Sequence, residues 1–209
     1  MRHGAWSMLG AVGVLLLTSG CVAIEAGHEG VMVEQPFFFG HGGVDPAPSK
    51  TGRVWVAPTT KVIEVDVRPL QYSEHFDIIS AENAPVSFDA FMIANVVESR
   101  SPELISRYGP NWYQNNVKEA FRTFVREEVQ RYPLFQLTTD PTTRTKLQDA
   151  IAREVQNKLI DKQNMPIRLN RVVVGSILPP KGVVEQTTQT IVQEQRKITM
   201  VEFQKAEEA

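Results

Sequence analysis

The stretch that decides the fold runs from Val86 to Val97 and reads VSFDAFMIANVV. Its residues alternate with a period of two, which is typical of a β-strand. One face carries only apolar side chains, namely Val86, Phe88, Ala90, Met92, Ala94 and Val96. The other face is also partly apolar, with Phe91, Ile93 and Val97. Because both faces carry apolar groups, we expect this strand to lie at the centre of a sheet.

Shorter strands are predicted upstream of this stretch. Glu29–Val33 and Arg53–Val56 are short apolar segments, and Ile63–Val67 alternates aliphatic with acidic residues. Between Pro36 and Pro58 the chain is rich in Gly and Pro, which indicates loops around the short strand that it contains.

Downstream, the pattern changes to a helical period at Ser101. Ser101 is the predicted N-cap of a short helix with Pro102 at its first position. A longer helix is expected between Asn111 and Pro133, and Asp140 is expected to cap a third. The remaining segments are predicted as a strand over Ile167–Ile177 and a final helix over Lys181–Ala209. This order predicts an α+β fold with a projecting C-terminal helix.

Composition limits the function. The chain has 209 residues, of which 42% are hydrophobic and 22% charged, so an ordinary globular protein is expected. Its formal net charge is -2, without the basic excess that drives binding to nucleic acid. Cys21 is the single cysteine, which excludes an internal disulfide and a zinc site built from several cysteines.

The N-terminus predicts an export signal. Arg2 precedes an apolar run over residues 8–17, and the small residues Thr18-Ser19-Gly20 come directly before Cys21. This arrangement resembles the lipobox of bacterial lipoprotein signals. We therefore expect residues 1–20 to be removed and Cys21 to be acylated, with Val22 directing the protein to the outer membrane where the envelope has two membranes. Two alternatives stay open: an uncleaved membrane-spanning helix over Ala5–Ile24, and a buried free thiol at Cys21.

No motif predicts catalysis. The four histidines are not spaced as metal ligands, no Gly-x-Ser-x-Gly sequence occurs, and the glycines at 40–43 fit no phosphate-binding loop. We predict no catalytic residue, no metal, no cofactor and no enzymatic activity. The run Phe37-Phe38-Phe39 has two interpretations, because three consecutive phenylalanines either fill the sheet or contact a membrane or a neighbouring subunit.

The C-terminal segment contains a weak heptad pattern. Val184, Ile191 and Ile198 are spaced by seven residues, and Val201 falls at an intervening position, whereas Thr187 and Glu194 make the other intervening positions polar. Candidate contacts for self-association are therefore Val184, Ile191, Ile198 and Val201.

Several segments, in their order and spacing, resemble the SPFH or Band 7 domain of stomatin, prohibitin and flotillin. Glu29–Val33 is similar to the opening strand of that family, Thr51–Pro58 to its Pro-Gly-x-x-x-x-x-Pro segment, and Ile63–Arg68 to its aliphatic strand ending in arginine. Glu82–Asp89 is similar to its acidic turn, and Val174, Ile177 and Pro180 to its domain exit. The resemblance covers residues 25–195 and implies an SPFH-like domain over 21–180, with residues 181–209 as a helix for oligomerisation.

Such a domain implies a scaffold that self-associates and organises membrane proteins or lipids. Its expected partners are membrane lipid, through acylated Cys21, further copies of the chain, and an unidentified membrane or envelope protein; nucleic acid is not expected. The alternative is a monomeric binding module of the cell envelope that recognises a protein or a glycan through Pro36–Pro58.

Overall fold

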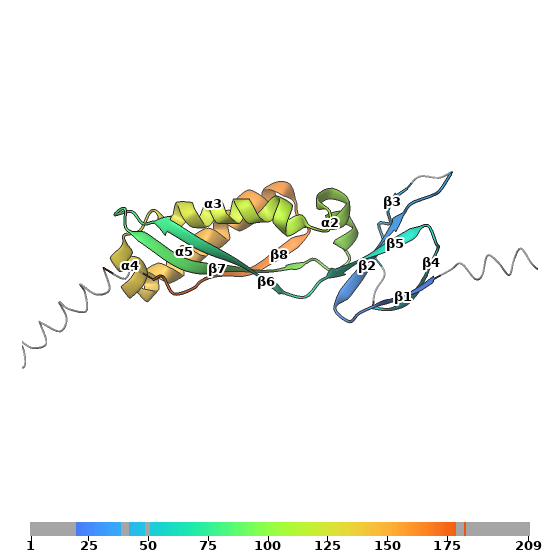
Figure 1. Cartoon of the computed structure of the whole chain (residues 1–209), viewed down its shortest axis with the longest axis horizontal. Helices are drawn as coiled ribbons and strands as arrows, with labels where there is room; N and C mark the ends of the chain where they lie inside the picture. The colour runs from blue at the N-terminus through green and yellow to red at the C-terminus, as the bar shows by residue number, and fades with distance from the viewer. Residues whose placement is uncertain (1–19, 39–41, 49–50, 179–181, 183–209) are drawn as a thin grey trace, which may run out of the picture.

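A computed structural model describes residues 20–38, 42–48, 51–178 and 182. Within these residues the molecule is elongated, as Figure 1 shows. Short strands form one end, and a longer sheet covered by helices forms the other. The fold is α+β, as the sequence predicts.

The longer sheet is built around β7 (Pro85–Val96), which pairs antiparallel with β6 (Leu70–Ile79) on one side and β8 (Ile167–Val174) on the other. The prediction of a central strand is confirmed, since β7 is the middle strand of the three. Its buried face carries the predicted apolar residues, namely Val86, Phe88, Ala90, Met92, Ala94 and Val96.

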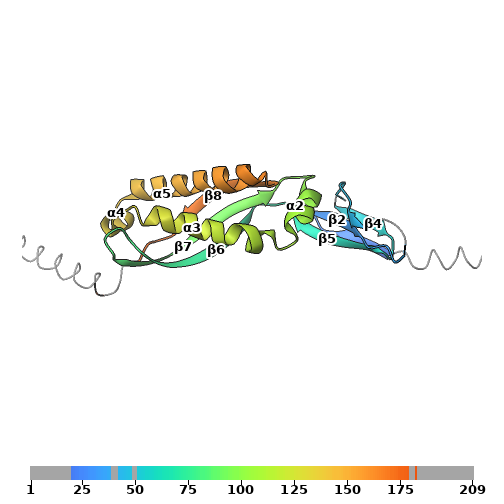
Figure 2. The same cartoon turned by 90° about the horizontal axis from the view of Figure 1, so that it is seen from above.

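Helices cover this buried face of the sheet, and none of the helices in the described ranges lies on the opposite face (Figures 1 and 2). In chain order they are α2 (Ser101–Tyr108), the π-helix η1 (Tyr113–Val117), α3 (Lys118–Val129), α4 (Leu134–Thr139), α5 (Pro141–Glu154) and the π-helix η2 (Val155–Asp161). The predicted cap of α5 is confirmed: the Asp140 carboxylate accepts a hydrogen bond of 2.9 Å from the Thr142 N–H. Bonds from the hydroxyls of Thr143 and Thr142 lower the pKa of Asp140 to about 2.

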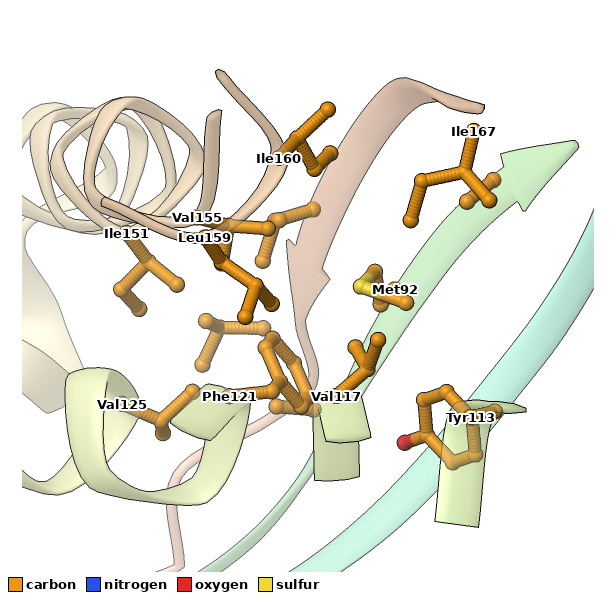
Figure 3. Close-up of a cluster of buried hydrophobic side chains, with 14 of the residues drawn as sticks. Met92, Tyr113, Val117, Phe121, Val125, Ile151, Val155, Leu159, Ile160 and Ile167 are labelled. Atoms are coloured by element: carbon orange, nitrogen blue, oxygen red, sulfur yellow. The ribbon is translucent and has the colours of Figure 1, made fainter. Parts of the chain in front are cut away.

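The core lies between this helix layer and the sheet. Phe121 and Val125 of α3 face Ile151 of α5 and Leu159 of η2, and Met92 of β7 lies beside Phe121 (Figure 3). The Phe121 ring meets the Phe76 ring edge to face, with 6.4 Å between their centroids. Apolar residues at three- and four-residue spacing on the helices thus pack against the apolar face of β7, whose residues alternate with a period of two.

Two small sheets form the other end of the molecule. In one, β2 (His28–Glu34) lies between β3 (Gly43–Val44) and β5 (Thr60–Asp66); in the other, β1 (Gly20–Ile24) pairs with β4 (Gly52–Val56). The β1–β4 ribbon packs closely on β2, because a Cβ added at Gly30 would lie 2.5 Å from Cδ1 of Ile24. The predicted strands at 29–33 and 53–56 are confirmed to within a residue, and the strand predicted at 63–67 begins three residues earlier, at Thr60, and ends at Asp66.

Several predictions differ from the structure. Ser101 is the first helical residue rather than the N-cap of α2, because its hydroxyl donates to the Glu29 carboxylate instead of accepting from its own helix. The long helix ends at Val129, before Pro133, and the last strand ends at Val174, where the Gly175 N–H bonds to Asp89. The sequence did not predict β1, β3, β6 or α4.

The alternative of a membrane-spanning helix over residues 5–24 is wrong for residues 20–24, the part that the structure describes, because Gly20–Ile24 is a strand. Within the described ranges, no helix combines the length and apolar character that crossing a membrane requires. The predicted helix over Lys181–Ala209 lies outside the described residues, apart from Gly182.

Candidate functional site

The β1–β4 ribbon places Cys21 beside a large aromatic residue. Cys21 is exposed and forms no disulfide, so the alternative of a buried thiol is wrong. Directly opposite it in the antiparallel register stands Trp55, which is 72% exposed. Opposite residues of an antiparallel pair project from the same face, so the thiol and the indole share the outer face of the ribbon. The alternate residues Ile24 and Val56 are buried and hold the ribbon against the fold.

Phe37 and Phe38 add exposed apolar surface at the same end of the molecule. They follow Gln35 and Pro36 after the end of β2 and are 76% and 90% exposed, so they do not fill the sheet as one interpretation proposed. Phe39 lies outside the described residues. The strands β2 and β3, on either side of this segment, lie at the end of the fold that also carries the β1–β4 ribbon (Figure 1).

This arrangement suits contact with a lipid surface. An exposed thiol at the start of a strand is accessible to an acylating enzyme. An indole is amphipathic, and tryptophan is enriched where a membrane meets water. The thiol and the indole therefore form one exposed patch on the outer face of the ribbon.

The face of the longer sheet that lies opposite the described helices carries a charged cluster centred on His75. Its Nδ1 lies 2.8 Å from Oδ1 of Asp89, and its Nε2 lies 3.5 Å from both Oδ2 of Asp77 and Oγ of Ser87. The residues form a Ser–His–Asp arrangement, but a second carboxylate competes for Nε2. The hydrogen bond to Asp89 is the main cause that raises the pKa of His75, with Asp77 adding to it. A protonated Nε2 donates to Asp77 and does not take a proton from Ser87, so this cluster is an ion pair network.

His75 makes stability depend on pH. Because its pKa is raised in the folded state, the stabilisation is fully present below the ordinary value of 6.5 and is lost as the pH rises through the folded pKa. We therefore expect His75→Gln to destabilise the protein at pH 5.5 and to have no effect at pH 9, by urea unfolding at both values. An NMR titration of His75 that gives a pKa at or below 6.5 would contradict this.

The predicted oligomer contacts Val184, Ile191, Ile198 and Val201 lie outside the described residues. Among the described residues, no group of histidine, cysteine and acidic side chains is arranged to hold a metal ion. The sequence did not single out Trp55. The sequence contained a signal for it, because a tryptophan on the polar face of the strand at 53–56 is unusual. Its position opposite Cys21, however, depends on the register in which β4 pairs with β1.

The described fold thus defines an α+β domain with exposed apolar residues at one end and a helix-covered sheet at the other. Residues 22–209 match the family model of the SPFH domain / Band 7 family, and the chain belongs to this family. Its members are generally membrane-associated scaffolds, and the predicted resemblance is confirmed. No curated protein matches the chain.

Proposed function

We propose that this protein is a lipid-anchored scaffold of the bacterial cell envelope, held by acylated Cys21, that self-associates and organises neighbouring membrane proteins or lipids. The observation that carries the proposal is the pair of Cys21 and Trp55, both exposed and opposite each other at one end of the fold. Family membership supports the scaffold role, and the signal-like residues 1–20 support export.

The anchor has a simple energetic basis. Each CH₂ group of an acyl chain contributes about 0.8 kcal/mol when it is buried in the bilayer, so more than one chain holds the protein stably. Because β1 contains Cys21 itself, the anchor would hold the β1–β4 ribbon directly at the membrane surface. Trp55, Phe37 and Phe38 would then add apolar contact with the lipid interface.

Anchoring also favours self-association. Copies confined to a membrane have a higher effective concentration, so weak contacts between them suffice. The contacts we propose are Val184, Ile191, Ile198 and Val201, and the expected destination is the outer membrane where the envelope has two membranes. A further membrane or envelope protein would be the partner that the assembly organises.

Cys21→Ser is expected to abolish anchoring. The hydroxyl does not replace the thiol as the acylated group, so the variant should lose incorporation of an alkyne-labelled fatty acid and move from the membrane to the soluble fraction. The measurement is labelling in cells of the full chain, followed by fractionation and immunoblotting.

Ala23→Ser is the matched control, because Ala23 is exposed on the same face of β1. This variant should still incorporate the labelled fatty acid and stay in the membrane fraction. A Cys21→Ser protein that stays in the membrane would contradict the lipid anchor.

Light scattering of the detergent-extracted wild-type protein tests the scaffold by its oligomeric state. A monomer at every concentration would favour the binding module with a site in Pro36–Pro58.

A further inference from the structure

The face of the longer sheet that lies opposite the described helices, here called the far face, carries a strip of apolar side chains. Phe91 and Ile93 of β7 project from it, because Met92 between them is buried on the helix-covered face. Val173 of β8 stands opposite Phe91 in the antiparallel register and therefore shares the far face. All three are half-buried, and none of the described helices covers them (Figure 2). A sheet face that meets water normally carries polar residues, so this strip indicates a partner.

One end of the far face is acidic. The carboxylates of Asp77 and Asp89 lie there, with the ring of His75 between them. Their side chains are 76% and 54% exposed, so both are accessible to a partner. Even when His75 is protonated, it balances only one of the two carboxylates, and this end keeps a negative charge.

The other end of the far face is basic. Arg171 stands opposite Ile93, and Arg168 stands opposite Asn95. Opposite residues of an antiparallel pair project from the same face, so both arginines belong to the far face. Both are exposed, and within the described part of the chain neither forms an ion pair or a side-chain hydrogen bond. The far face thus carries opposite charges at its two ends, with Phe91 between them.

We propose that the far face binds a second copy of this chain, so that the two longer sheets pack face to face. Along β7, Phe91 lies two residues from Asp89 and two from Ile93, about 7 Å in each direction. A two-fold axis that crosses the strands at Phe91 exchanges these two positions. Arg171 of each copy then faces the end of the other copy that carries Asp89. Phe91 and Val173 meet at the centre, as the inner faces of two packed sheets do.

Charge complementarity selects a second copy as the occupant. A cationic or an anionic partner would match only one end of the far face, whereas a second copy matches both ends at once. Three strands spaced about 4.8 Å apart cover a flat area of only roughly 500 Å², which is at the small end for specific interfaces. The contact therefore rests on the proposed function, because confinement to the membrane makes a weak contact sufficient. It is separate from the proposed contacts at residues 184–201.

The test is photo-cross-linking of the full chain in cells. The probe p-benzoylphenylalanine replaces Phe91, and we expect ultraviolet light to yield a covalent dimer joined through β7 or β8 of the second copy. Ser73 of β6 stands opposite Phe91 and is exposed, so the probe at this second position leaves the apolar strip intact and should give the same dimer. The control position is Phe135, which is exposed on α4 and lies outside the far face.

Arg171→Glu should lower the yield of this dimer at least about tenfold, because the symmetric contact contains the repulsive pair twice. Asp89→Arg should do the same. When the two variants are expressed together with different tags, each supplies the charge that the other needs, and the cross-linked heterodimer should return. Arg126→Glu makes the same change at an exposed position of α3 and should leave the yield unchanged.

The proposal is overturned by the absence of a covalent dimer from both probe positions, by an equal dimer from Phe135, or by a heterodimer that does not return. A cross-link to another protein, or to residues 183–209 of the same copy, would overturn the second copy as the occupant. Fractionation and light scattering of the same samples report on the anchor and on the multimer. A multimer that stays in the membrane without this cross-link would therefore contradict the far-face contact alone.

Discussion

Phe121→Ala is expected to lower the free energy of unfolding by about 3–5 kcal/mol, the range for truncating a buried aromatic residue. Phe121 is completely buried on α3 and lies between the helix layer and the sheet (Figure 3). Its removal takes away the edge-to-face contact with Phe76, whose ring in turn stacks on Phe88 at 5.3 Å. The cavity left behind would loosen the packing of α3 on the sheet, and urea unfolding followed by circular dichroism measures the loss.

Phe135→Ala is the matched control, because Phe135 lies on the short helix α4 and is 72% exposed. The same chemical change there should cost less than about 0.5 kcal/mol. If Phe121→Ala does not fold, Phe121→Leu keeps part of the volume and should lose about 1 kcal/mol. Equal losses at positions 121 and 135 would contradict the position of the core described above.

Glu29→Ala is expected to lower the free energy of unfolding by about 2–3 kcal/mol, because it leaves the buried hydroxyl of Ser101 and the Ser99 N–H without their charged acceptor. Glu29 lies on β2 and is buried. Its carboxylate accepts a hydrogen bond of 2.6 Å from the Ser99 N–H and another from the Ser101 hydroxyl. No side chain caps α2 by a hydrogen bond, and Glu29 of β2 adds a second negative charge, beside Glu103 in the first turn, at the end of the helix that favours one.

Hydrogen exchange gives a second readout for this contact. The amides of α2 should exchange faster in Glu29→Ala, because the variant opens the junction between β2 and this helix. Glu34→Ala is the control: Glu34 lies on the same strand but is exposed, so its loss should be within about 0.5 kcal/mol. A Glu29→Ala protein as stable as Glu34→Ala, with unchanged exchange in α2, would show that the contact does not stabilise the junction.

The longest elements could be predicted from the sequence because their patterns are local. β7 has an uninterrupted alternation of apolar residues, and α3 and α5 carry apolar residues at helical spacing. In contrast, β6 has Glu74 on its buried face, which breaks the alternation. Arg122 of α3 approaches that carboxylate to 2.9 Å, so the position is tolerated only through a contact with another element.

The residues of the candidate sites likewise fall into those that a local sequence pattern predicts and those that only contacts between elements bring together. Cys21 follows from the sequence, since a signal-like segment ahead of a single cysteine is a pattern within about twenty residues. Its partner Trp55 follows only from the register of β1 with β4. The contact between Tyr72 and Trp112 likewise joins residues that lie far apart in the chain.

By itself, the sequence determined the α+β class, the central strand, the main helices and the family. Each of these depends on the periodicity, the order and the residue types of contiguous segments, which decide the face that an element turns to the core. Only the tertiary structure decided that Glu29 bonds to Ser99 and Ser101 at the start of α2, that Trp55 stands beside Cys21, and that the ring of Tyr72 meets those of Trp112 and Tyr113. These contacts join residues from separate elements, and no local pattern records which elements will pack together.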